Sequence, residues 1–267
     1  MEIVNYFKAQ SVEEAYKKLI ENPSNLIIGG GAWLRLSSKI VETAIDLEHV
    51  GLNKIVETDS SIEFDASVTL RELEKTEALK KLFGGIVNKG VNGIMGVALR
   101  NLATVGGSIF GKYSFSDFIT PLLAMNTEVE LYKAGRMKLE DFLKFRSKEK
   151  DILLKLIVSK EEGLGYYYKM KKTGLDFAVI NVAVSLSNSK FKIVVGARPS
   201  LAAYAFKAME FINSKKEITK EIIEETVEIA ANELKFGTNS KASKEYRIEL
   251  AKVYIRRGLN EVTNNEN

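Results

Sequence analysis

Apolar and polar residues follow two periods along the chain, and together these predict a mixed fold of helices and strands. A helical period over residues 11–22 opens with Ser11 and Glu14, which have the spacing of a capping box. A short apolar strand that ends in three glycines is expected over 25–31, and a further strand over 43–47. We read this first stretch as a β-α-β-β unit.

The middle of the chain changes from alternation to helical spacing and back. Alternation near residues 61–69 leads into a helical stretch over 71–83, and a second helix is expected over 118–125. A hairpin and a short helix follow over 127–143, and residues 151–159 read as a closing strand. Eight of the 19 glycines fall between Gly84 and Gly111, which predicts tight turns or close approaches of the backbone there.

The last hundred residues predict a three-stranded sheet followed by helices. The second and third strands are joined by the turn signal Ser-Asn-Ser-Lys at 187–190. Helical periods then cover residues 200–212, 219–234 and 243–262. We therefore expect an α+β chain.

Composition and charge narrow the class of protein. The chain has 267 residues, of which 45% are apolar, and a formal net charge of +4 that is spread along the sequence. The absence of a basic stripe argues against nucleic acid as a partner. No apolar run approaches the roughly 20 residues that cross a bilayer, and residues 1–10 lack a secretory signal pattern. We expect a cytoplasmic location and no membrane partner.

Two residue types that carry much of protein chemistry are almost missing. There is no cysteine, and His49 is the single histidine. Thiol catalysis, iron–sulfur ligation and Cys/His zinc sites therefore cannot be built from this chain alone, and no metal site is expected. Any redox chemistry must use a bound organic cofactor.

Two glycine-rich segments are the candidate binding site. Gly29 to Gly31 follow one strand, and Gly106 and Gly107 lie in the run Asn-Leu-Ala-Thr-Val-Gly-Gly-Ser, with Asp117 about ten positions later. Bare backbone lets amide groups approach phosphate oxygens, while a carboxylate accepts from sugar hydroxyls. Structural turns explain these glycines about equally well, because neither GxGxxG nor GxxxxGK[ST] is present.

Several segments resemble, in the same order, the flavin-binding medium subunit of molybdenum hydroxylases of the xanthine dehydrogenase and carbon monoxide dehydrogenase type. They include NLIIGGGAWL, LRNLATVGGSIFGKYSFSDF and YYYKMKKTGLDFAVINVAV, and the run R-N-x-A-T-x-G-G is the most specific. The resemblance implies a two-lobed FAD-binding fold like that of vanillyl-alcohol oxidase (PCMH type), followed by a small α+β C-terminal domain. It assigns residues 1–55 and 56–160 to the two lobes and 161–267 to the C-terminal domain.

The resemblance also implies which residues contact FAD. Residues 28–34 lie on the pyrophosphate, and residues 104–108 form the other phosphate and ribityl loop. Asp117 contacts the sugar or ribityl hydroxyls. Leu153 makes a backbone or apolar contact, and Lys169 is a cation near the cofactor. The cofactor-binding residues are therefore Ile28, Gly29, Gly30, Gly31, Ala32, Trp33, Leu34, Thr104, Val105, Gly106, Gly107, Ser108, Asp117, Leu153 and Lys169.

In the family that the chain resembles, electrons reach FAD from 2Fe–2S clusters on a small subunit, after substrate is oxidised at a molybdopterin centre on a large subunit. FAD then reduces NAD or another acceptor. The resemblance thus implies an electron-transfer subunit that is active only within a complex, and no side chain of this chain is assigned a catalytic role.

Two alternatives are open. Trp33 stands where the family has a small polar residue, and Ser108 where it commonly has asparagine, which motivates a scaffold subunit that has lost FAD. Thr173 likewise replaces an expected arginine. The other alternative is a self-contained flavin oxidase, although the C-terminal hundred residues offer little room for a substrate cap.

Overall fold

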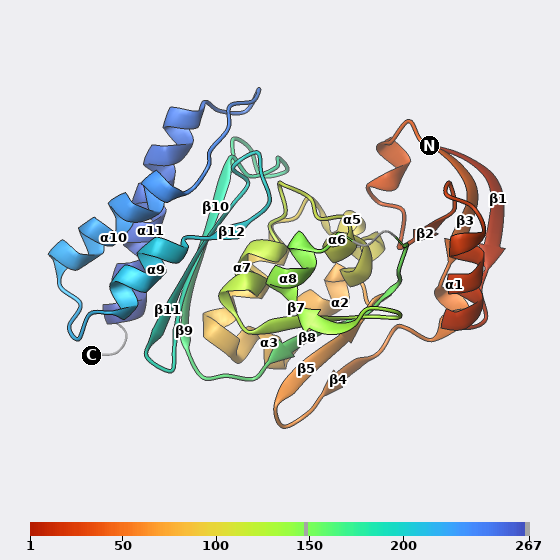
Figure 1. Cartoon of the computed structure of the whole chain (residues 1–267), viewed down its shortest axis with the longest axis horizontal. Helices are drawn as coiled ribbons and strands as arrows, with labels where there is room; N and C mark the ends of the chain where they lie inside the picture. The colour runs from red at the N-terminus through yellow and green to blue at the C-terminus, as the bar shows by residue number, and fades with distance from the viewer. Residues whose placement is uncertain (147–148, 265–267) are drawn as a thin grey trace. The chain divides into compact units, whose positions relative to one another are not determined.

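The structure is a computed structural model that describes residues 1–146 and 149–264 (Figure 1). Contacts divide the chain into two compact units. The first unit comprises Met1–Lys75, Gly96–Gly111 and Thr127–Val158, and the second comprises Thr76–Met95, Lys112–Asn126 and Ser159–Asn267. The predicted division into 1–55, 56–160 and 161–267 stays a prediction.

The first unit begins with a small parallel sheet. Its strand order is β1 (Glu2–Lys8), β3 (Ile40–Asp46), β2 (Leu26–Ile28). Helix α1 (Val12–Glu21) is capped as its sequence predicts, since Ser11 Oγ accepts a hydrogen bond from the amide of Glu14 at 3.1 Å. Its apolar face packs with Ile45 and the residues around it.

A five-stranded sheet completes the strands of the first unit. The order is β4 (Ile55–Glu57), β5 (Ser61–Asp65), β8 (Leu153–Ser159), β6 (Thr127–Leu131), β7 (Gly135–Lys138). The unit also holds the helices α2 (Leu70–Lys75), α5 (Val97–Leu102), α6 (Val105–Phe110) and α8 (Leu139–Lys144), and the 3₁₀ turns η1 (Leu34–Leu36) and η2 (Glu48–Val50).

The second unit is built on an antiparallel sheet of order β12 (Ala203–Tyr204), β11 (Lys190–Gly196), β10 (Ile180–Ser187), β9 (Leu164–Met170). Helices α9 (Phe206–Asn213), α10 (Lys220–Glu233) and α11 (Lys244–Asn264) cover one face (Figure 1). The segment α7 (Ile119–Ala124) packs on β10 and β11, and α4 (Ile86–Asn92) packs on β9. Strand β10 is buried along almost its whole length, as expected for a strand covered on both faces.

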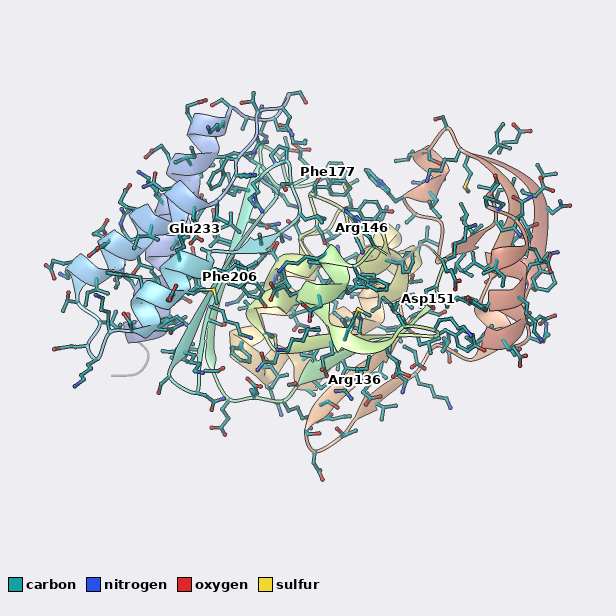
Figure 2. All side chains as sticks on the ribbon, viewed as in Figure 1. Arg136, Arg146, Asp151, Phe177, Phe206 and Glu233 are labelled. Carbon is teal, nitrogen blue, oxygen red and sulfur yellow. The ribbon has the colours of Figure 1, made fainter. Side chains whose placement is uncertain are left out.

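One side chain links two of these helices. Glu233, at the end of α10, accepts hydrogen bonds from the amides of Lys207 and Ala208 at 3.0 and 2.9 Å (Figure 2). These are the first-turn amides of α9, which have no partner within that helix. Glu233 therefore fixes the start of α9 against α10.

The mixed helix and strand fold is confirmed, and three local expectations differ from the structure. The helix expected over 71–83 is split into α2 and α3 (Glu77–Lys81), because Thr76 is extended, with φ −67° and ψ 110°. Strand β12, the fourth strand of its sheet, lies where helix was expected. Residues 105–110, expected as part of a loop, form α6.

The described chain lacks two features. None of its helices has both the length and the apolar character to span a membrane. Over the same residues, no group of His, Asp or Glu side chains could hold a metal ion.

Candidate functional site

The first glycine segment is a left-handed turn at the end of β2. Gly30 and Gly31 have φ values of +65° and +62°, a conformation that residues with a Cβ rarely adopt. The amides of Gly30, Gly31 and Ala32 donate no hydrogen bond to any residue that the structure describes. Gly30 is exposed and its two successors are half-buried, so three successive amides at this turn are open to a ligand.

The second glycine segment is the first turn of α6. Thr104 caps this helix, since its Oγ1 accepts from the amide of Gly107 at 3.1 Å. The amides of Val105 and Gly106 donate to Val68 O and Ala66 O, both at 2.8 Å. The turn is therefore anchored to the chain on its inner side, while Gly107 is exposed.

The two segments meet directly. A Cβ on Gly29 would lie 2.6 Å from Thr104 Oγ1, and a Cβ on Gly107 would lie 3.3 Å from Gly29 O. A Cβ on Gly30 would overlap the carbonyl oxygen of Leu102. These three glycines are bare because the segments pack against each other.

Gly31 is different, because an added Cβ would have only Ile28 Cγ2 nearby, at 3.7 Å. Packing within the described chain therefore does not explain the glycine at position 31, and its contact with a ligand stays a prediction. Trp33, two residues later, is 36% exposed.

A buried ion pair holds the segment that leads into α6. Arg100 on α5 donates from Nε to Glu74 Oε2 at 3.0 Å, and Arg71 on α2 donates to the same oxygen at 2.8 Å. Arg100 is 4% exposed. Burial disfavours the charge on Glu74, but the two arginines outweigh burial and lower the pKa of Glu74 below its usual value. The pair joins α2 to α5, two residues before Leu102.

Asp117 and Lys169 lie together in the second unit. The Asp117 carboxylate is buried, and its Oδ1 accepts from Asn181 Nδ2 at 2.7 Å and from the Tyr167 hydroxyl at 3.3 Å. Its Oδ2 lies 3.3 Å from Lys169 Nζ and 3.8 Å from Lys171 Nζ. Burial, and then the charge of Asp117, raise the pKa of Tyr167 well above its usual value.

The two lysines also close the end of α4. Lys169 Nζ donates to Gly90 O at 2.6 Å, and Lys171 Nζ donates to Gly93 O. Ammonium groups are favourable at the C-terminal end of a helix, where carbonyls lack partners. The cluster is thus one carboxylate with two ammonium groups.

The structure thus brings together Gly29, Gly30, Thr104 and Gly107, and separately Asp117 and Lys169. Leu153 begins β8, pairs with Leu131 and is buried, and its contact with the cofactor stays a prediction. Tyr167, Lys171 and Asn181 were not among the predicted site residues. Only Lys171 had a signal in the sequence, as a cation near Thr173.

Comparisons with known proteins cover nearly the whole chain. The family model described as FAD binding domain in molybdopterin dehydrogenase matches residues 2–160, and that of the CO dehydrogenase flavoprotein C-terminal domain matches residues 165–262. The glyceraldehyde dehydrogenase medium chain of Sulfolobus acidocaldarius is 21% identical over 276 residues, which cover 97% of this chain and 98% of that protein.

Two solved structures share the fold. Quinoline 2-oxidoreductase from Pseudomonas putida 86 has a chain with a TM-score of 0.87 and 20% identity, covering 98% of this chain and 97% of that chain. Carbon monoxide dehydrogenase from Hydrogenophaga pseudoflava also gives a TM-score of 0.87 at 20% identity, with 97% and 96% covered.

Proposed function

The chain belongs to the family of FAD-binding domains of molybdopterin dehydrogenases, and from that premise we propose that it passes electrons from iron–sulfur clusters of a partner subunit through FAD to NAD or another acceptor. Membership makes it an FAD-binding component of an oxidoreductase. The direction of electron flow and the identity of the acceptor belong to the proposal.

The observation that carries the proposal is the set of three free amides at Gly30, Gly31 and Ala32. Successive amides in a left-handed turn form a concave, partly positive surface that suits phosphate oxygens. Gly31 leaves room above that surface, and the first turn of α6 lies against Gly29. The residues present therefore fit a dinucleotide, and we assign the FAD diphosphate to residues 28–34 and 104–108.

Bound FAD would supply the redox chemistry, since its isoalloxazine can accept and release electrons one or two at a time. The work of this chain is to hold the diphosphate and to fix the groups around it. Thr104 keeps the amide of Gly107 in place, and the Arg100–Glu74 pair holds α5 behind Leu102. No side chain needs to form a covalent bond.

We give Asp117 a narrower role than direct contact with hydroxyls. Its two oxygens already face four partners, which is about the number of hydrogen bonds that a carboxylate accepts. In this proposal Asp117 orients Lys169 and Lys171, and Lys169 is the cation near the cofactor. Leu153 contributes through its backbone.

The partners belong to the proposal too. We expect a large molybdopterin-binding subunit and a small 2Fe–2S subunit, in keeping with the words "medium chain" in the name of the Sulfolobus relative. A cytoplasmic location is part of the same expectation.

The alternative is a scaffold subunit without flavin. Trp33, the only tryptophan of the chain, stands two residues after Gly31, where an indole turned over the free amides would block phosphate. The three free amides favour the flavin-binding proposal over this alternative.

The test is a flavin titration. The full chain is purified, its flavin content is read from the absorption spectrum after denaturation, and the apoprotein is titrated with FAD. We expect one FAD for each chain. Purification without flavin, together with no saturable FAD binding by the apoprotein, would support the scaffold alternative.

A further inference from the structure

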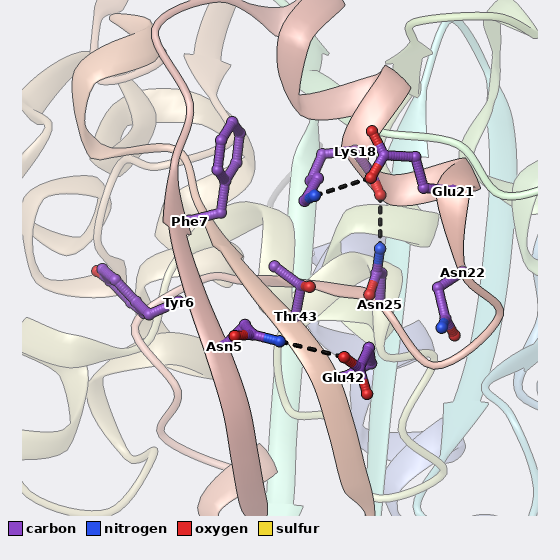
Figure 3. Close-up of a pocket in the computed structure, with 9 residues that line it drawn as sticks. All are labelled: Asn5, Tyr6, Phe7, Lys18, Glu21, Asn22, Asn25, Glu42 and Thr43. Atoms are coloured by element: carbon purple, nitrogen blue, oxygen red, sulfur yellow. Dashed lines mark hydrogen bonds and ion pairs between the residues drawn. The ribbon is translucent and has the colours of Figure 1, made fainter.

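A second candidate site lies in the first unit, beside α1. A pocket of about 510 Å³ is bordered by β1, by the end of α1 with the turn after it, and by β3 (Figure 3). None of the residues assigned to FAD lines this pocket. Its lining is mostly polar, so its chemistry can be read from the hydrogen bonds that its side chains make and those that they lack.

Asn25 presents a buried acceptor with no donor. Its side chain is 3% exposed and lines the pocket, and its Nδ2 donates to Lys18 O at 2.7 Å. That bond fixes the orientation of the amide, because a carbonyl oxygen at the end of a helix needs a donor. Asn25 Oδ1 then has no hydrogen-bond partner in the described chain, and Figure 3 shows it on the side of Thr43 and Glu42.

An unsatisfied buried acceptor costs about 1–3 kcal/mol, so such a group indicates a missing donor. Thr43 lies in the same pocket and is 5% exposed. Its hydroxyl also forms no hydrogen bond with the residues that the structure covers. Asn25 Oδ1, which is fully buried, and the Thr43 hydroxyl, which is not fully buried, thus both lack a partner among the described residues.

The charge of the pocket is negative. Glu42 receives one hydrogen bond, from Asn5 Nδ2 at 3.1 Å, and no cationic side chain of the described residues pairs with it. Lys18, the one lysine or arginine among the described residues of the lining, forms an ion pair with Glu21 at 2.8 Å. Glu42 is therefore the uncompensated charge.

A further cation nearby is engaged elsewhere. Lys150 Nζ donates to the backbone carbonyls of Leu19, Asn22 and Asn25, the last at 2.5 Å. It closes the end of α1 through main-chain oxygens and leaves the Asn25 side chain untouched. The described residues thus supply no donor to Asn25 Oδ1.

We infer that this pocket binds a small organic cation whose primary ammonium or guanidinium group donates to Asn25 Oδ1 and Thr43 and faces the Glu42 carboxylate. Such a head group carries several N–H donors and a positive charge, which together match two acceptors and one carboxylate. This site is independent of FAD binding.

The test uses calorimetric titration of the full chain with putrescine, and with 1,4-butanediol as a neutral molecule of the same length. We expect saturable binding of one putrescine for each chain and none of butanediol. Glu42→Gln and Thr43→Val should each weaken binding at least about tenfold, since a hydrogen bond to a charged group is worth about 1.5–3 kcal/mol.

Glu57→Gln, on the exposed strand β4 of the same unit, is the matched control and should leave binding unchanged. FAD content and thermal unfolding check that each variant is folded. Absence of saturable heat with putrescine would mean that the pocket holds water only and would overturn the inference. Equal binding of butanediol, or unchanged binding in Glu42→Gln, would overturn it as well.

Discussion

At the scale of single residues, the glycines of the candidate site divide by what surrounds them. Gly29, Gly30 and Gly107 are bare because backbone or a hydroxyl of the facing segment occupies the place of a side chain. Gly31 is bare at an open surface. A substitution at Gly31 therefore probes the ligand, whereas one at Gly30 probes the packing.

We expect Gly31→Ala to weaken FAD binding at least about tenfold. The left-handed φ of +62° strains a residue with a Cβ by about 1–2 kcal/mol, and relief of that strain would turn the amides away from the diphosphate. FAD titration measures the effect. Gly51→Ala is the matched control, because Gly51 has a φ of +82° and nothing within 4 Å of an added Cβ. Equal FAD affinity in the two variants would count against the assignment.

Gly107→Val should lose most of its FAD and still fold. The new Cβ would lie 3.2 Å from Thr104 Oγ1 and 3.3 Å from Gly29 O, so the two segments must separate by a few tenths of an ångström. Circular dichroism and flavin absorption measure fold and cofactor. Gly96→Val is the control, since nothing lies within 4 Å of a Cβ there. Retention of one FAD for each chain in Gly107→Val would contradict the proposal.

At the scale of elements, the sequence predicted those whose signals are local. The capping-box spacing of Ser11 and Glu14 predicted α1, and long helical periods predicted α10 and α11. The helix α6 was not predicted from the sequence, because it contains two adjacent glycines, which are poor helix formers. Its cap and its anchoring to Ala66 and Val68 come from the tertiary structure.

The candidate site, like the helices, could be predicted from the sequence only where its signals are local. Glycine spacing and family resemblance pointed to both segments, and their convergence, which the predicted diphosphate contact requires, is present. The contact of Gly30 with Leu102 O depends on how α5 is held, and α5 is held by Glu74, 26 residues away in the chain. No local pattern carries that information, and contact with FAD stays a prediction.

The pair of Arg100 and Glu74 makes the joint between α2 and α5 sensitive to acid. Because the pKa of Glu74 is lower in the folded chain, its contribution to stability is present above the unfolded pKa and is lost as pH falls through the folded pKa. Glu74→Gln should lower the free energy of unfolding by about 2 kcal/mol at pH 7. The difference from the parent chain should shrink below about pH 4.

Urea unfolding at several pH values measures this. The control is Glu128→Gln, whose ion pair with Arg136 is exposed and should contribute less than about 1 kcal/mol. A constant difference between Glu74→Gln and the parent from pH 7 to pH 3 would show that charge on Glu74 does not stabilise the joint.

At the scale of the whole molecule, the interiors of the two units contain acidic groups whose pKa values are shifted in opposite directions. The first unit contains the Glu74 ion pair. The second contains Tyr167, whose pKa is raised well above its usual value by burial and then by Asp117, and Tyr166 and Tyr254, whose pKa values burial raises to about 12. Acid should therefore weaken the first unit, and alkali the second.

For the tyrosines the sign is the reverse of that for Glu74. A pKa that is raised in the folded chain gives stability that is complete below the unfolded pKa of about 10 and is lost as pH rises through the folded value. We expect the amides of β9 and β10 to lose their protection against hydrogen exchange between about pH 10 and pH 12. Urea unfolding that is followed by hydrogen exchange measures this loss. Tyr167→Phe removes one of these groups together with its bond to Asp117, so this variant should be less stable at pH 7 but should lose less on going to alkali. An alkaline loss as large as that of the parent chain would show that Tyr167 is not what makes the second unit sensitive to high pH.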